Sequence, residues 1–188
     1  MVVYGNPTEL KDFRDKVLHA QEKGDELKHW HLYQIYEEFG YEEKFILNGE
    51  DNNGYIRGNI DYVDEIVEDK RGFSYLRIDY ESAWSSMYEG FDWLLKRHYK
   101  TLKQVTIAEE FGCEVFINTD KDGLFFEERF ILEAEDIDTF YAESKEQLIK
   151  VMNEEICKGD VCHSLQDCYD YIDSHDELYI SLHEYSCD

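Results

Sequence analysis

A group of side chains near the C-terminus could bind a metal: Cys157, Cys162, His163 and Cys168, with Cys187 as a further candidate. Thiolate and imidazole groups are ligands that zinc prefers, and four of them form a tetrahedral site. Structural sites favour ligand pairs two to four residues apart, and Cys157-x4-Cys162 only reaches the edge of that range. Cys168 also fits the apolar side of a helix, where a free cysteine packs as a small hydrophobic residue. A zinc-binding protein therefore stays an alternative, and no cofactor is predicted.

Closely spaced carboxylates offer a second kind of chemistry. Residues 164–177 predict a helix with carboxylates opposite its apolar side, at Asp167, Asp170, Asp173 and Glu177. Neighbouring carboxylates on such a face lie about 5–6 Å apart, and on a strand Glu133 and Glu135 would lie about 6.6 Å apart. These spacings are near those between phosphates of a nucleic-acid backbone, so the array could occupy lysine and arginine sites that bind phosphate. The alternative is a solvated acidic surface that increases solubility.

The whole chain is strongly acidic, with 44 Asp and Glu against 19 Lys and Arg and a net charge of −25 over 188 residues. Such a charge repels nucleic acid and anionic membranes. A content of 43% hydrophobic and 15% aromatic residues predicts a folded protein rather than a disordered tail. Residues 1–100 carry a net charge of −8 and residues 101–188 carry −17, so the acidic face is expected in the second half. A basic protein surface is the partner that this charge predicts.

Enzyme motifs are missing from the sequence. It contains no G-x-S-x-G, Walker A, G-x-G-x-x-G or H-E-x-x-H pattern, and carboxylate pairs are too numerous to single out a catalytic one. The stretch Asn118-x-Asp120-x-Asp122-Gly123 matches the first half of a calcium-binding loop. However, Arg129 stands where the bidentate glutamate should be, so a hairpin turn at Asp122-Gly123 is the better interpretation. No enzymatic activity is predicted.

The N-terminus lacks the basic and apolar regions of a secretory signal, and no apolar run is long enough to span a membrane. Five cysteines, an odd number, indicate reduced thiols and a cytoplasmic location. For a phage-encoded chain this would be the cytoplasm of the host.

Helices and strands alternate along the predicted fold, which is α+β. A first helix is expected to begin with Thr8 as its N-cap and to end at Gly24. Further helices are expected at 29–39, 82–99, 144–157 and 165–173, and strands at 2–4, 55–63, 73–80, 104–111, 114–118, 124–132 and 178–185. Residues 135–138 read as an acidic break.

Three segments carry a family resemblance. Residues 3–10 with Phe13 resemble a strand–glycine–helix start, residues 81–86 resemble a T-A-W-S-P-P segment, and residues 109–116 resemble a Y-x-E-x-G-x-x-F hairpin. These are features of the YubB-like family of ferredoxin-like proteins from plasmids and phages, although the family's proline pair is Ser85-Ser86 here and its tryptophan-rich middle is missing. The resemblance covers roughly residues 2–132. It implies a ferredoxin-like antiparallel sheet with helices on one face and a mobile-element origin, and it supplies no catalytic residues.

These observations predict a ferredoxin-like core at residues 1–132 and an acidic extension at residues 133–188, with helices and a final strand, packed on the core. The predicted function is a mobile-element-encoded inhibitor, of the anti-CRISPR or antirestriction type, that mimics nucleic acid and blocks the basic channel of a host nuclease complex. No direct binding of nucleic acid or membrane is expected, and a homodimer is possible. The alternative is an accessory scaffold that binds its partner through apolar contacts. The predicted partner-binding residues are Glu133, Glu135, Asp136, Asp138, Tyr141, Asp167, Asp170, Tyr171, Asp173, Asp176 and Glu177.

Overall fold

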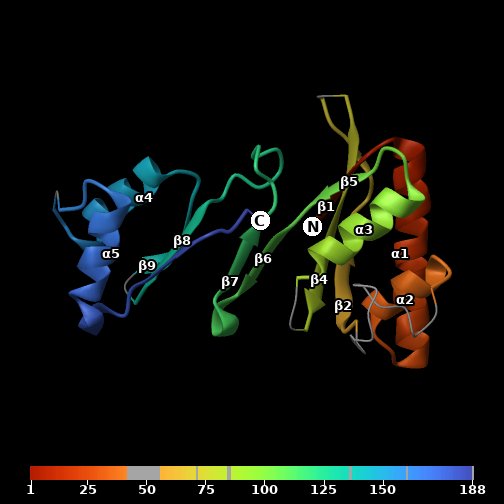
Figure 1. Ribbon diagram of the computed structural model, residues 1–188, viewed down its shortest axis with the longest axis horizontal. Helices are drawn as coiled ribbons and strands as arrows, with labels where there is room; N and C mark the ends of the chain where they lie inside the picture. Colours follow the sequence, from red (N-terminus) through yellow and green to blue (C-terminus); the bar gives the residue numbers. More distant parts are fainter. Residues whose placement is uncertain (42–55, 71, 84–85, 136, 160, 188) are drawn as a thin grey trace. The chain divides into compact units, whose positions relative to one another are not determined.

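The structure is a computed structural model that describes residues 1–41, 56–70, 72–83, 86–135, 137–159 and 161–187 (Figure 1). These residues form a mixed α/β protein with antiparallel sheets and five α-helices, as the sequence predicts at this level. The chain divides into two compact units, Met1–Thr106 and Ile107–Asp188, called unit 1 and unit 2 below. The boundary expected after residue 132 falls inside a strand of unit 2, because residues 130–134 pair with two later strands of that unit. None of the described helices has the length and apolar character needed to cross a bilayer.

Unit 1 is built around one sheet with the strand order β2-β4-β1-β5, in which all neighbours are antiparallel and β3 also pairs with β4. Val3 lies opposite Leu76, and Leu76 and Ile78 point to the same face because strand side chains alternate. Helices α1, α2 and α3 pack their apolar sides on that face. The elements in chain order are β1 (Val2–Gly5), α1 (Pro7–Leu27), α2 (His31–Glu38), β2 (Gly58–Val63), β3 (Val67–Glu68), β4 (Ser74–Ser82), α3 (Tyr88–His98) and β5 (Lys103–Val105).

Helix α1 differs from its prediction at both ends. Asn6, not Thr8, is the N-cap: its side chain accepts hydrogen bonds from the backbone N–H groups of Thr8 and Glu9, and Pro7 occupies the first turn. The helix continues through Gly24 because this glycine is buried against α2, where an added Cβ would lie 2.4 Å from Cδ2 of His31. Gly24 therefore permits close packing of two helices rather than ending one.

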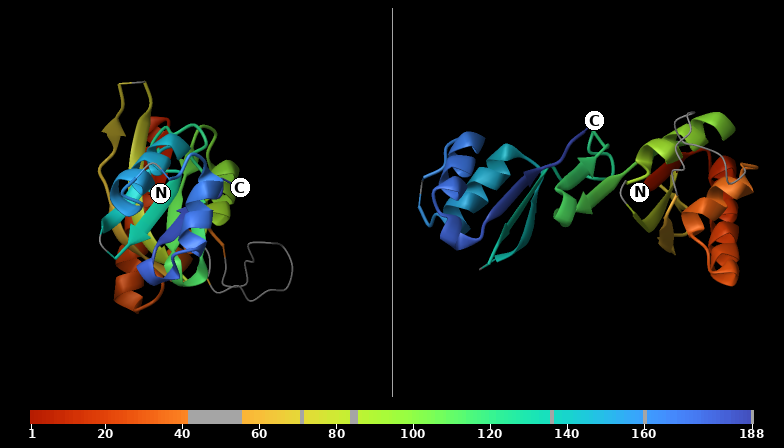
Figure 2. Two further views of the ribbon diagram at one scale, coloured as in Figure 1. Left: turned by 90° about the vertical axis from the view of Figure 1, so that its left-hand side faces the viewer. Right: turned by 60° about the horizontal axis from the view of Figure 1, so that its bottom comes forward.

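Unit 2 contains a hairpin, β6–β7, and a second sheet with the order β10-β8-β9 (Figure 2). Phe130 and Leu132 of β8 face helices α4 and α5, whereas Ile131 faces the other way and packs with Phe116 and Tyr185. The sheet thus has a small apolar core on each face. The elements are β6 (Ile107–Glu110), η1 (Phe111–Cys113), β7 (Val115–Asn118), β8 (Phe130–Ala134), β9 (Ile137–Ala142), α4 (Lys145–Val151), the π-helical turn η2 (Met152–Ile156), α5 (Leu165–Asp173), η3 (Asp176–Leu178) and β10 (Ser181–Glu184).

One prediction in unit 2 is wrong, and another is only partly right. The predicted hairpin at Asp122-Gly123 does not form, because β7 pairs with β6 and the next strand begins only at Phe130. The acidic break expected at 135–138 is shorter than predicted, because Glu135 lies in a turn after β8 but β9 already begins at Ile137 and pairs with β8.

Candidate partner-binding surface

The segment between β7 and β8 is fixed by three polar side chains. Oδ2 of the buried Asp120 accepts hydrogen bonds from the backbone N–H groups of Phe125, at 2.6 Å, and Phe126, at 2.9 Å. The amide of Asn118, also buried, donates to the carbonyl oxygens of Phe126 and Glu128. The guanidinium of Arg129 donates to the carbonyl oxygens of Asp120, Phe126 and Glu128 at 2.8–3.0 Å. This positive charge is therefore directed at backbone carbonyls.

A hollow of about 240 Å³ lies beside this segment, lined by Gly123, Leu124, Phe125, Glu127, Glu128, Tyr141 and Glu143. Three of its lining side chains are carboxylates. Oε2 of Glu128 is buried and has no hydrogen-bond partner among the described residues. A buried carboxylate oxygen without a donor is unfavourable, so a cation bound in the hollow, which Glu128 lines, would stabilise this carboxylate.

Next to this hollow, two tyrosines share one carboxylate. The hydroxyl of Tyr141 donates to Oε2 of Glu109 at 3.4 Å, and the hydroxyl of Tyr185 donates to Oε1 of the same residue. Burial, followed by the contact with Glu109, raises the pKa of Tyr185, and the same two causes raise the pKa of Tyr141. Both phenols therefore stay protonated at neutral pH, and Glu109 of β6 is linked to β9 and to the residue that follows β10.

Five exposed carboxylates gather at one end of unit 2. The pairing of Ser181 with Glu133 puts the start of β10, and η3 shortly before it, beside the end of β8. The β8–β9 turn and the C-terminal end of α5 lie at the same end of the unit (Figure 1). We call this group the acidic end; it consists of Glu135, Asp138, Asp173, Asp176 and Glu177. All five are among the partner-binding residues predicted from the sequence, and Asp136, also predicted, lies outside the described residues.

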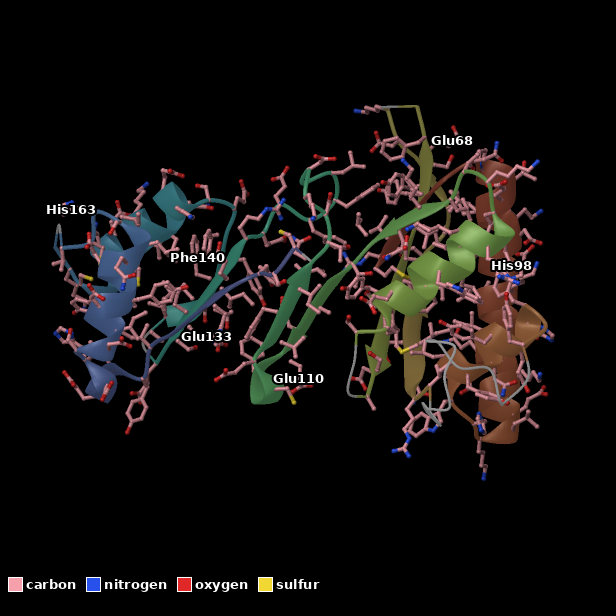
Figure 3. The ribbon with its side chains drawn as sticks, in the orientation of Figure 1. Glu68, His98, Glu110, Glu133, Phe140 and His163 are labelled. Carbon is pink, nitrogen blue, oxygen red and sulfur yellow. The ribbon has the colours of Figure 1, made fainter. Side chains whose placement is uncertain are left out.

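The other selected residues do not belong to the acidic end. Glu133 accepts hydrogen bonds from the hydroxyls of Thr139 and Ser181, so its carboxylate is engaged across the sheet. In Figure 3, His163 marks the end of unit 2 where α5 begins, and Glu133 lies on β8 away from it. Tyr141 lies opposite Ile131 on the face away from α5 and contributes to the hollow instead.

Three selected residues of α5 already have intramolecular contacts. Asp167 closes a capping box: its carboxylate accepts from the N–H groups of His163, at 2.8 Å, and Ser164, at 2.9 Å, and these bonds lower its pKa. Asp170 accepts from the side chain of Gln166. Tyr171 packs into the core beside α4 and stacks on His175, with ring centroids 4.1 Å apart.

One prominent aromatic side chain and the glutamates of the hollow are not among the residues predicted from the sequence. Tyr179 is 77% exposed, directly after η3, and its backbone is in the left-handed region at φ 47°. The alternation of apolar and polar residues predicted a strand from 178 to 185, which would include Tyr179. The strand begins only at Ser181, so the predicted pattern gives no information on the exposure of Tyr179. Glu127, Glu128 and Glu143 meet only through the pairing of β8 with β9, which brings Arg129 to Ala142.

The carboxylates of unit 2 have few cationic neighbours. Of the ion pairs whose two partners are described, only Lys150–Glu154 lies in unit 2, at 4.0 Å. Among the described residues there is also no group of three or more His, Cys, Asp or Glu side chains arranged to hold a metal. Cys157, Cys162 and Cys168, considered above as ligands of an alternative zinc site, do come together, but as contacting thiols.

Comparison of the chain with protein-family models, curated proteins and solved structures found no match. The resemblance to the YubB-like family stays a prediction. The chemistry available at this surface is the binding of cations: an open acidic end, a hollow with a buried carboxylate oxygen, and exposed tyrosine rings.

Proposed function

We propose that the protein is a non-enzymatic inhibitor encoded by a mobile element, of the anti-CRISPR or antirestriction type. Unit 2 occupies the basic nucleic-acid channel of a host defence complex and excludes DNA or RNA. The observation that carries this proposal is the uncompensated charge of unit 2, which has 23 Asp and Glu against 5 Lys and Arg. Carboxylates that lack internal cations are available to cations of a partner.

Binding combines three kinds of contact. The acidic end pairs with lysine and arginine side chains that otherwise hold phosphates. The hollow beside Tyr141 receives one basic side chain, whose N–H groups satisfy the buried oxygen of Glu128. Tyr179 and Tyr141, 77% and 42% exposed, stack on arginine.

For unit 1 we propose a ferredoxin-like arrangement, in keeping with the resemblance. Its support is the antiparallel order β2-β4-β1-β5, with α1 and α2 between β1 and β2, and α3 between β4 and β5. In this proposal unit 1 is a folded platform and unit 2 supplies the binding surface.

The direct test is an affinity pull-down from host lysate across a salt series, with the bound proteins identified by mass spectrometry. We expect one nucleic-acid-binding complex that is captured at low salt, displaced by added DNA or RNA, and lost as the Debye length falls below about 10 Å. Binding that survives high salt and added nucleic acid would contradict mimicry. It would support the scaffold alternative, because apolar contacts are not screened.

Two variants, each with three charge-reversing substitutions, make the test specific to the acidic end. The test variant carries Glu135→Lys, Asp173→Lys and Glu177→Lys, at exposed positions outside the described hydrogen bonds. The matched control carries Glu22→Lys, Glu26→Lys and Asp61→Lys, at exposed positions of unit 1, and changes the net charge equally.

We expect the test variant to lose about tenfold or more in affinity, and the control to lose much less. Several desolvated charge pairs, each worth more than a surface pair, disappear only in the test variant. Equal losses in the two variants would show that net charge, rather than the acidic end, determines binding. Circular dichroism checks that both variants are folded.

A further inference from the structure

Cys157 and Cys162 face each other in unit 2 and have no part in the proposed function. Cys157 directly follows η2, and Cys162 lies shortly before α5. Their Sγ atoms are 3.8 Å apart. A disulfide bond has an Sγ–Sγ length of about 2.05 Å, so an approach of less than about 2 Å would join them.

Asn153 holds the two cysteines in this geometry. Its Oδ1 accepts hydrogen bonds from the backbone N–H groups of Val161, at 3.0 Å, and Cys162, at 2.8 Å. Its Nδ2 donates to the carbonyl oxygen of Cys162 at 2.8 Å, and its own carbonyl accepts from the N–H of Gly159. Because a residue of η2 fixes the backbone of Cys162, the reduced protein already holds the thiols at a short separation, and closing the ring orders little additional chain.

The two thiols differ in their access to solvent. Cys162 is 1% exposed, whereas Cys157 is half-buried and is the one that a small molecule can reach. Cys168 of α5 is fully buried, and its thiol contacts that of Cys162. Burial and the neighbouring Cys162 raise the pKa of Cys157 to about 11. The thiolate is then a minor species at neutral pH, so oxidation is slow and follows the sustained redox state of the surroundings.

We propose that Cys157 and Cys162 are a redox modification site, converted to an intramolecular disulfide by a low-molecular-weight disulfide such as oxidised glutathione. The thiolate of Cys157 attacks one sulfur of the small disulfide, which breaks its S–S bond and releases one thiol. The thiolate of Cys162 then attacks Sγ of Cys157, forms the Sγ–Sγ bond and releases the second thiol. Two cysteine thiols are oxidised and one small disulfide is reduced to two thiols, so atoms and electrons balance.

The disulfide would join the end of η2 to the chain that enters α5. These two segments pack on the same face of the β10-β8-β9 sheet. Oxidation therefore fixes the connection between η2 and α5 within the helical layer of unit 2, and reduction releases it. The site depends only on the fold of unit 2, so it stands or fails independently of the proposed inhibitor function.

The test is equilibration of the folded full-length protein in buffers of reduced and oxidised glutathione, followed by acid quenching, alkylation and peptide mapping without reduction. We expect the oxidising buffer to produce a Cys157–Cys162 cross-link with loss of two of the five thiols, and dithiothreitol to restore them. An absent cross-link, or a cross-link of Cys162 to Cys168 in its place, would overturn the assigned pair.

Three variants distinguish this site from general cysteine oxidation. C162S removes the second nucleophile, so Cys157 is expected to stop at the mixed disulfide with glutathione. C168S is expected to keep the cross-link within about twofold of the original extent, and so is C113S, which removes an exposed thiol outside the site. Loss of the cross-link in a C168S protein that circular dichroism shows to be folded would contradict the proposal.

Discussion

The two units differ in how far their charged side chains are paired within the unit. Unit 1 has 21 Asp and Glu against 14 Lys and Arg, and several of these charges pair internally, as in Arg14–Glu65 at 2.5 Å and Lys23–Glu37 at 2.8 Å. Unit 2 has 23 against 5, and its most deeply placed cation, Arg129, is directed at carbonyl oxygens. Some of the charge in unit 1 is therefore compensated within the unit, whereas most of the charge in unit 2 is left available for binding.

The units also differ in how their chains are held. Unit 1 encloses one apolar cluster between a sheet and three helices. Unit 2 divides its apolar residues between two sheet faces and fixes a long irregular segment with Asn118, Asp120 and Arg129. Unit 1 thus has one apolar cluster, whereas unit 2 adds a buried hydrogen-bond network to its apolar clusters.

The largest effect is expected from the core of unit 1. Phe13 is fully buried, so Phe13→Ala should lower the free energy of unfolding by about 4 kcal/mol. Chemical denaturation measures this loss, and amide hydrogen exchange should place it in unit 1. Leu132→Ala, at a fully buried position of β8, is the matched change in unit 2. If Phe13→Ala reduced protection equally throughout residues 1–188, the division into two units would be wrong.

A smaller loss is expected at the polar segment of unit 2. Arg129→Ala removes the donor to three carbonyl oxygens and should destabilise unit 2 by about 2–3 kcal/mol. Arg129→Lys keeps the charge without the planar fork and should recover only part of the loss. In the same hydrogen-exchange measurement, residues 120–129 should lose protection before the rest of unit 2. That result would support the role of hydrogen bonds, rather than apolar packing, in fixing this segment. An unchanged stability in Arg129→Ala would mean that water replaces the guanidinium without penalty.

The N-caps of α1 and α5 can be compared through substitutions that should lower the free energy of unfolding by about 1 kcal/mol or less. Asn6→Ala removes the acceptor that caps α1 and should cost about that amount. Ser164→Ala should cost less, because the carboxylate of Asp167 still accepts from the backbone of the α5 cap. Thermal unfolding of the two variants measures the difference. A larger loss for Ser164→Ala would show that the two halves of the capping box act only together.

The smallest effects concern pH. Hydrogen bonds from Lys16 and Tyr99 lower the pKa of Asp12 in unit 1, and backbone N–H groups lower that of Asp167 in unit 2. A depressed pKa contributes stability above the unfolded value of about 4, and that contribution is lost as pH falls through the folded value. NMR titration should find both pKa values below 3.8. Added salt should raise the pKa of Asp12 more than that of Asp167, because salt screens the ion pair of Asp12 with Lys16. Equal changes in the two pKa values would contradict this difference between the units.

Much of unit 1 could be predicted from its sequence. The positions of Leu10, Phe13 and Val17 recur at helical spacing, and α1 forms there with these residues buried. Its ends were misplaced because Asn6 competes with Thr8 as a cap and because Gly24 has a packing role that only the position of His31 reveals.

Unit 2 was harder to predict because side chains decide where its backbone goes. Phe125 and Phe126 suggest a strand, but the carboxylate of Asp120 accepts from both of their N–H groups and holds the segment in a loop. The acidic residues themselves could be selected from charge and spacing. Their grouping could not, since it depends on the pairing of Ser181 with Glu133 across 48 residues of chain.

The irregular segment from Asp120 to Arg129 has a consequence for proteolysis. Surface loops without helix or strand are the usual sites of proteolytic cleavage, and Arg129 would be a cleavage site for a trypsin-like protease. Here the guanidinium that such an enzyme must bind is occupied by the carbonyl oxygens of Asp120, Phe126 and Glu128. Cleavage after Arg129 therefore requires local unfolding of the loop, so this bond is protected by the very side chain that a trypsin-like protease would recognise.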